Sequence, residues 1–297
     1  MGATEDAPAR RVIAGERPAC IAGWGTRVAL SPNFVSRLLV AAAGLPLVLG
    51  VVWLGGWWLF ALATVVGMLA LHEYYAMTRP LRPILIAGYL GLVLTLVAEE
   101  AGGLSWVAGG LFTTFALAFL LKGAATTKQS ATVSVGATML GVAWIALGLV
   151  YLLALRDLPE RGRLCAFTVL LAVWAGDTLA FAVGRLVGRH KLAPTVSPGK
   201  TWEGLVAGTF ATVFVTFVAL YDTRHEFLSI GQAVLLGLAI AVAAPLGDLF
   251  ESLVKRDMGV KDSGHLLAGH GGVLDRIDAQ LFAAIAAFYV VLAFDKL

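Results

Sequence analysis

The chain has 297 residues, of which 59% are hydrophobic and 14% are charged, and its mean hydropathy is +0.85. Soluble domains carry about 25% charged residues, so this composition excludes an ordinary soluble domain and predicts an integral membrane protein. The formal net charge of +3 is too small to argue for a nucleic-acid partner. Two cysteines, Cys20 and Cys165, make neither a disulfide framework nor a cysteine metal cluster.

The beginning of the chain, residues 1–33, differs from the rest because its basic residues are scattered among Gly, Ala and Pro. It lacks the apolar core of about 7–15 residues that a signal peptide needs. We therefore expect a poorly ordered tail on the cytoplasmic side of the membrane.

Nine apolar runs follow this tail, and each is an expected transmembrane helix of a polytopic, all-α bundle. A helix needs about 20 residues to cross a bilayer, so the second, third and ninth runs are expected to tilt or to extend into their polar flanks. The runs cover residues 34–54, 57–71, 84–98, 104–121, 133–155, 164–184, 204–221, 230–250 and 280–294.

The basic residues are distributed unevenly between the two sides that these runs define. With a cytoplasmic amino terminus, most of the 22 Lys and Arg residues fall on the cytoplasmic side, as the positive-inside rule requires. The same orientation places both polar stretches described below on the cytoplasmic face. The basic residues left outside are Arg156, Arg161, Arg163, Arg224 and Lys296.

The second run is followed directly by the polar pair His72 and Glu73. Polar and charged side chains at the end of a span commonly reach the membrane interface. We therefore interpret both residues as interfacial, and the alternative is that they line an entrance for lipid.

The sixth run contains Asp177, a carboxylate inside an otherwise apolar segment. A charge within the membrane is expensive and needs a partner or a function. The side chain could pair with Arg185 or with another helix for packing. The functional alternative is that it forms a polar wall of an active cavity.

The loop before the seventh run reads Ser-Pro-Gly-Lys-Thr-Trp-Glu-Gly over residues 197–204. Ser197, Lys200 and Thr201 offer two hydroxyls and a cation on a turn shaped by Pro and Gly, which can hold phosphate oxygens. Glu203 begins the seventh run, where an acid can also simply stabilise the helix amino terminus.

The second polar stretch spans residues 247–278 and carries most of the remaining charge. On the eighth run, Asp248 lies three residues before Glu251 and four before Ser252, so the three side chains share a helix face. Asp275 and Asp278 are three apart in the first turn of the next segment, where the positive end of a helix favours carboxylates.

Cations and glycines lie between these acids. Lys255, Arg256 and Lys261 follow the eighth run, and glycines at 269, 271 and 272 let the backbone approach a ligand closely. Carboxylates, cations and bare backbone together suit a polyphosphate bound through a divalent cation.

The stretch from Ser252 to Asp278 resembles the signature of the phosphatidate cytidylyltransferases, membrane enzymes also called CDP-diacylglycerol synthases. The signature runs Ser-x-apolar-Lys-Arg, four residues, Lys-Asp, a short link, then His-Gly-Gly-apolar-x-Asp-Arg-apolar-Asp. Ala268 departs from it, because Pro or Gly is usual there, and this affects loop stiffness rather than chemistry. Asp177 and the loop of residues 197–204 also match the family.

This resemblance covers residues 164–294, whereas the first five runs match only in general character. Together with the apolar runs, it divides the chain into a tail over 1–33, transmembrane helices 1–5 over 34–163, and a catalytic part over 164–297 with helices 6–9 and two cytoplasmic motif loops. It also implies transfer of the cytidylyl group of CTP to phosphatidic acid, which gives CDP-diacylglycerol and pyrophosphate for phospholipid synthesis.

The resemblance assigns roles to the candidate residues. Asp248 and Asp275 would hold Mg²⁺, with Asp278 available to a second cation, and Lys255 and Arg256 would complete the catalytic group. The residues expected to contact substrate are Asp177, Ser197, Lys200, Thr201, Glu203, Ser252, Lys261, His270 and Gly271. We further expect Lys200 to meet the lipid headgroup, apart from Lys255 and Arg256, which would adjoin the metal and CTP.

Two alternatives remain for the function. The same chemistry could act on another lipid phosphate, such as an isoprenoid or ether lipid. A cation-coupled transporter would instead place acids near the midplane of two similar halves, and no internal repeat is evident. The expected setting is a bilayer, as a multi-pass protein of a bacterial inner membrane with its active site facing the cytoplasm, and a homodimer is a candidate assembly.

Overall fold

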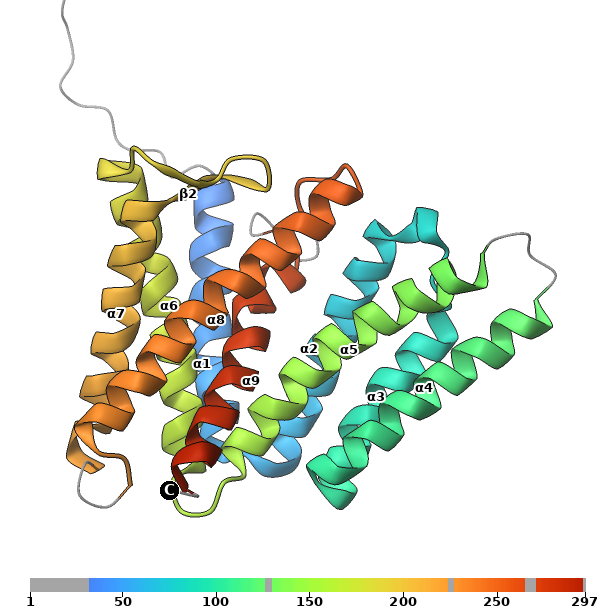
Figure 1. Cartoon of the computed structure of the whole chain (residues 1–297), viewed down its shortest axis with the longest axis horizontal. Coiled ribbons are helices and arrows are strands. Elements are labelled where there is room, and N and C mark those ends of the chain that lie inside the picture. Colours follow the sequence, from blue (N-terminus) through green and yellow to red (C-terminus); the bar gives the residue numbers. More distant parts are fainter. Residues whose placement is uncertain (1–31, 126–129, 224–226, 265–270, 296–297) are drawn as a thin grey trace, which may run out of the picture.

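A computed structural model describes residues 32–125, 130–223, 227–264 and 271–295 of the chain. All but the last two residues of the expected tail, 1–33, lie outside the described residues. Within the described ranges the chain forms nine α-helices and one short β-hairpin (Figure 1). The helices are α1 (Pro32–Leu54), α2 (Gly56–Met77), α3 (Leu85–Gly102), α4 (Leu104–Ala124), α5 (Ala131–Arg156), α6 (Gly162–Val187), α7 (Trp202–Leu220), α8 (Ile230–Asp257) and α9 (Leu274–Asp295).

Eight of these helices, α2 to α9, are long and apolar enough to cross a membrane. Helix α1 has a shorter apolar part, Gly44–Leu54. The prediction of an all-α, polytopic membrane protein is therefore confirmed. The expected lengthening of short runs is also confirmed, since α2 continues to Met77, α3 to Gly102, and α9 begins at Leu274.

Helix α8 is longer at its carboxyl end than the sequence predicted. The apolar run was expected to end at residue 250, but the helix continues to Asp257. The added turns are polar in sequence, yet Glu251 and Ser252 are buried. Glu251 pairs with Lys255 and Ser252 donates to Asp248, both on the same helix. This extension puts the whole polar group from Asp248 to Arg256 on one helix.

The loop before α7 is partly a β-hairpin, which the sequence did not predict. Strand β1 (Lys191–Ala193) pairs antiparallel with β2 (Ser197–Thr201), and the peptide nitrogen of Trp202 donates to the carbonyl of His190 at 2.9 Å. The Pro-Gly pair that suggested a turn lies within β2 instead. The hairpin and the carboxyl end of α8 lie at the same end of the bundle, opposite the α5–α6 connection (Figure 1).

Close helix contacts fix the position of α9 at the centre of the fold. Helix α5 packs on α9 as well as on α2, α3 and α4. A Cβ atom at Gly247 of α8 would lie 2.5 Å from the carbonyl oxygen of Asp278, and one at Gly148 of α5 would lie 2.7 Å from the Cα of Leu281. Small residues let helix backbones approach in this way. The contact at Gly247 brings Asp248 toward the first turns of α9.

Candidate active site

Two lysines pair with the acids of the second polar stretch. Lys200 of β2 lies 2.9 Å from Asp248 of α8, measured from Nζ to Oδ2. Lys255 Nζ lies 2.8 Å from Glu251 Oε2 and 2.7 Å from Asp275 Oδ1. The second group is far less exposed, since the side chains of Lys255, Glu251 and Asp275 are 12%, 1% and 12% exposed, against 21% for Lys200 and 38% for Asp248.

Backbone groups hold Asp275 in addition to the lysine. The peptide nitrogen of Gly272 donates to Oδ2 at 2.8 Å, and that of Ser263 donates to the same atom at 3.2 Å. Gly271 adopts a φ of +80°, a left-handed conformation that favours glycine. Asp275 therefore joins the segment after α8 to the first turn of α9, as a carboxylate at a helix amino terminus can.

Asp278 and Glu251 form the buried floor of the cluster. Asp278 is 6% exposed, its Oδ1 accepts from the peptide nitrogen of Ala279 at 2.7 Å, and it is an electrostatic neighbour of both Glu251 and Asp248. Glu251 Oε1 is buried and has no hydrogen-bond partner within the described residues. Sequence reasoning left Glu251 out of the site, although an acid three residues after Asp248 and four before Lys255 was the available signal.

The hairpin and α8 make a joint site, which corrects one expectation. Lys200 Nζ, besides pairing with Asp248, donates to the carbonyl of Pro245 at 3.3 Å. In return, Arg256 Nε donates to the carbonyl of Val196 at 3.2 Å. The sequence assigned Lys200 to a region apart from the metal acids, and this separation is wrong because the hairpin folds directly onto α8.

The remaining candidates of the hairpin region serve partly in local structure. Thr201 is 4% exposed and caps α7, its hydroxyl accepting from the peptide nitrogen of Gly204 at 3.1 Å. Glu203 Oε1 lies 2.7 Å from His190 Nδ1, so it ties the hairpin to α7. Ser197 is half-buried in β2. These contacts give Thr201 and Glu203 a structural role whether or not they also touch substrate.

Asp177 and Ser252 flank the Lys200–Asp248 pair. Asp177 of α6 interacts electrostatically with both members of that pair, whereas its alternative partner, Arg185, lies over the ring of Phe181 at 5.9 Å. The hydroxyl of Ser252 donates to Asp248 Oδ1 at 3.4 Å. The structure thus favours a place for Asp177 beside the site over the Arg185 pairing.

The last candidates lie in the connection between α8 and α9. Lys261 is exposed there, and Gly271 is half-buried beside Asp275. His270 lies outside the described residues, so its predicted phosphate contact stays a prediction.

The acids of the cluster have a chemistry that suits a divalent cation, although they are not arranged as a cage. Among the described residues, no three acidic, His or Cys side chains are grouped to hold a metal ion, and Lys200 and Lys255 pair with Asp248 and Asp275. Hard cations such as Mg²⁺ prefer carboxylate oxygens and are commonly bound through one or two carboxylates plus substrate phosphates. The partnerless Glu251 Oε1 is consistent with such a cation.

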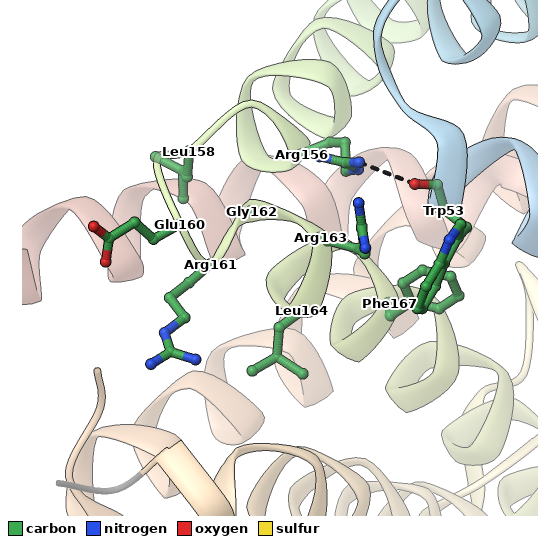
Figure 2. A pocket seen from close by; sticks show the side chains of 9 residues that line it. All are labelled: Trp53, Arg156, Leu158, Glu160, Arg161, Gly162, Arg163, Leu164 and Phe167. Atoms are coloured by element: carbon green, nitrogen blue, oxygen red, sulfur yellow. Dashed lines mark hydrogen bonds between the residues drawn. The ribbon is translucent and has the colours of Figure 1, made fainter. Parts of the chain in front are cut away.

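A separate pocket of about 570 Å³ lies around the α5–α6 connection, away from all the predicted site residues (Figure 2). Arg156 donates from Nε to the carbonyl of Val52 at 2.8 Å, and the guanidinium of Arg163 lies 4.4 Å from the ring centre of Trp53. These arginines fasten the end of α1 to the α5–α6 connection. The pocket holds none of the acids that would carry nucleotidyl transfer.

Comparison with known proteins shows the family of the chain. The model of the Cytidylyltransferase family matches residues 35–294. The phosphatidate cytidylyltransferase of Staphylococcus haemolyticus is 34% identical over 252 residues, which cover 83% of this chain and 94% of that protein. The enzyme of the same name from Mycobacterium bovis is 35% identical over 249 residues (78% and 79% of the two chains), and that of Haemophilus influenzae is 42% identical over 133 residues (44% and 46%). The match extends over the first five helices as well as the motif loops, and this chain belongs to the cytidylyltransferase family.

Proposed function

We propose that this protein transfers the cytidylyl group of CTP to phosphatidic acid, producing CDP-diacylglycerol and pyrophosphate. The observation that carries the proposal is the meeting of both motif loops in one cluster, where Lys200 pairs with Asp248 and Lys255 pairs with Asp275. Membership of the family and the names of its relatives supply the substrate class.

The reaction would be a direct displacement. An oxygen of the lipid phosphate attacks the α-phosphorus of CTP, a new P–O bond forms, the bond to the β-phosphate oxygen breaks, and pyrophosphate leaves with the electron pair. No covalent enzyme intermediate is needed, so positioning of the two phosphates and stabilisation of charge supply the catalysis.

The two lysines would take unequal parts in this step. Lys200 and Asp248 are the more exposed pair, so a phosphate oxygen can replace Asp248 as the partner of Lys200. Lys255 is enclosed by Glu251 and Asp275, and it would hold these two carboxylates together while it faces the triphosphate. Arg256, exposed beside the hairpin, would contact phosphate as well.

Mg²⁺ fits the donor set, with Asp248, Asp275 and Asp278 as the residues that would hold it. The cation would neutralise charge on the triphosphate and on the leaving pyrophosphate. The carboxylates paired with Lys200 and Lys255 already outnumber these lysines, so the site carries excess negative charge for a cation to balance.

The setting follows from the composition of the helices and from the charge asymmetry. The protein is an integral, multi-pass membrane protein, and we place it in a bacterial inner membrane with the cluster facing the cytoplasm, where CTP is made. A homodimer stays a prediction. A cation-coupled transporter is disfavoured, because the acids gather with lysines of two motif loops toward one end of the bundle.

The test is incorporation of label into lipid. Purified protein in mixed micelles receives phosphatidic acid, Mg²⁺ and CTP labelled at either the α- or the γ-phosphorus. Label from the α position should enter the lipid phase, whereas label from the γ position should stay in the aqueous phase as pyrophosphate. A parallel reaction with an isoprenyl phosphate tests the acceptor. Absence of lipid label with phosphatidic acid, or a clear preference for the isoprenyl acceptor, would overturn the proposal.

A further inference from the structure

Glu73, at the carboxyl end of α2, is buried against the motif loop instead of lying at the membrane interface as the sequence suggested. Its side chain is 2% exposed. Its Oε2 accepts from the peptide nitrogen of Leu274 at 2.8 Å and from the hydroxyl of Ser263 at 3.3 Å. Leu274 is the first residue of α9, so a carboxylate from the amino-terminal half of the chain caps the helix that carries Asp275.

Glycines in the surrounding backbone leave space for the Glu73 carboxylate. A Cβ atom at Gly264 would lie 2.6 Å from Glu73 Oε1, and one at Gly272 would collide with Oε2. Both positions therefore need glycine for steric reasons while Glu73 keeps its place. Ser263 and Gly264 lie on the α8 side of the connection and Gly272 lies on its α9 side, so Glu73 contacts both sides of it.

Two residues that contact Glu73, Ser263 and Gly272, also donate hydrogen bonds to Asp275. Ser263 gives its hydroxyl to Glu73 and its peptide nitrogen to Asp275, the latter at 3.2 Å. Gly272 packs on Glu73 and donates its peptide nitrogen to Asp275 at 2.8 Å. A negative charge is also favourable at the positive end of α9. Release of Glu73 would thus free two of the donors that orient Asp275.

We propose that Glu73 is a positioning residue for the reaction, acting through Ser263, Gly272 and the first turn of α9 to orient the Asp275 carboxylate. The expected effect on turnover rests on the proposed function, because the proposed function makes Asp275 a cation ligand. Its structural part, the restraint of the connection by Glu73, is independent of the substrate. The first five helices then contribute directly to the site, through α2.

The experiment compares three variants with the parent. Glu73→Ala removes the acceptor, and Glu73→Gln keeps an acceptor oxygen of the same reach but removes the charge. Glu99→Ala is the matched control, because Glu99 is also a buried acid (7% exposed) in the amino-terminal half and one of its oxygens lacks a partner among the described residues. Hydrogen–deuterium exchange of peptides covering residues 260–278 and the Mg²⁺ dependence of activity are measured for each protein.

In Glu73→Ala, exchange at the amides of Gly272 and Leu274 should rise about tenfold or more, as expected for loss of a hydrogen bond to a charged group. The Mg²⁺ concentration for half-maximal activity should rise with it, while Glu73→Gln should lie close to the parent in both measurements. Glu99→Ala should leave both unchanged. A general loss of structure would instead raise exchange throughout the chain.

Two results separate this inference from the proposed function. If Glu73→Ala leaves the exchange of residues 260–278 and the Mg²⁺ dependence at parental values, the positioning role is wrong even when the parent makes labelled lipid. If the parent makes no labelled lipid, the proposed function fails, and the exchange measurement still decides whether Glu73 restrains the connection. If Glu73→Ala unfolds generally, Glu73→Asp takes its place, because its carboxylate is one methylene shorter and loses the contacts with Leu274 and Ser263. Parental exchange of residues 260–278 and parental Mg²⁺ dependence in a folded Glu73→Asp would then overturn the positioning role.

Discussion

Replacement of Lys255 by Met should destabilise the folded protein much more than the same replacement at Lys200. Lys255 is the partner of two carboxylates, Glu251 and Asp275, and all three side chains are at most 12% exposed. Methionine has a similar length but no charge, so both acids would stay buried without a cation. Lys200 pairs with Asp248, whose side chain is 38% exposed and can turn to water.

The difference in burial between the two lysine pairs predicts different losses of stability for the two variants. Removal of one partner from a buried ion pair costs about 3–5 kcal/mol, whereas an exposed pair contributes about 0–1 kcal/mol. With a shift of roughly 2–4 °C per kcal/mol for a chain of this order of size, Lys255→Met should lower the melting temperature by about 6 °C or more. Lys200→Met should lower it by less than about 4 °C.

The assay is thermal unfolding in one detergent and in a Cys20→Ser background. Unfolding is followed by a thiol-reactive fluorescent dye that labels Cys165, which is 1% exposed in the folded protein. The double variant Lys255→Met/Glu251→Gln should recover part of the loss, because it removes one of the stranded charges. Equal losses in the two lysine variants, or no recovery in the double variant, would refute the reasoning from burial.

Two further predictions concern packing and topology. Gly247→Ala should destabilise the protein and lower turnover. The clash of its Cβ with the Asp278 carbonyl at 2.5 Å outweighs the helix-propensity gain of about 1 kcal/mol. The control is Gly231→Ala on the same helix, whose Cβ meets nothing within 4 Å and which should be neutral or stabilising in the same melting assay. In a Cys20→Ser background, a membrane-impermeant thiol reagent should label Lys261→Cys only from the cytoplasmic side and Asp157→Cys only from the opposite side, and the reverse pattern would overturn the proposed access of CTP.

Sequence reasoning predicted the helical fold, and it singled out the charged residues that the structure brings together, Lys200 with Asp248 and Lys255 with Asp275, because both signals are local. Apolar runs predict the transmembrane helices directly. Asp248, Asp275 and Lys255 stand out as charged residues beside apolar segments. The ends of the helices were less predictable, because an apolar run ends in the sequence at the first charged residue. Helix α8 continues through Glu251 to Asp257, and Lys255 pairs with Glu251 one turn further along the same helix. The other partner of Lys255, Asp275 on α9, becomes visible only in three dimensions.

Contacts between distant segments were beyond sequence reasoning. The hairpin could have met lipid headgroups alone, and only its folding onto α8 places Lys200 on Asp248. Glu73 lies about 200 positions before its partner Leu274, and nothing in its local pattern distinguishes it from an interfacial acid. Gly272 suggested a free backbone for a ligand, whereas the structure fills the space beside it with the Glu73 carboxylate and the Ser263 hydroxyl.

If the acids paired with the two lysines carry cytidylyl transfer, Asp248→Asn should abolish it. The substitution removes the charge that faces Lys200 without changing the volume of the side chain, and Asp222→Asn, in the short 3₁₀ turn after α7 (Tyr221–Thr223), is the matched control. Both purified variants are incubated with phosphatidic acid, Mg²⁺ and CTP labelled at the α-phosphorus. We predict that the control labels lipid at the parental rate and that Asp248→Asn, with a parental melting temperature, labels none. Parental labelling by Asp248→Asn would contradict the account.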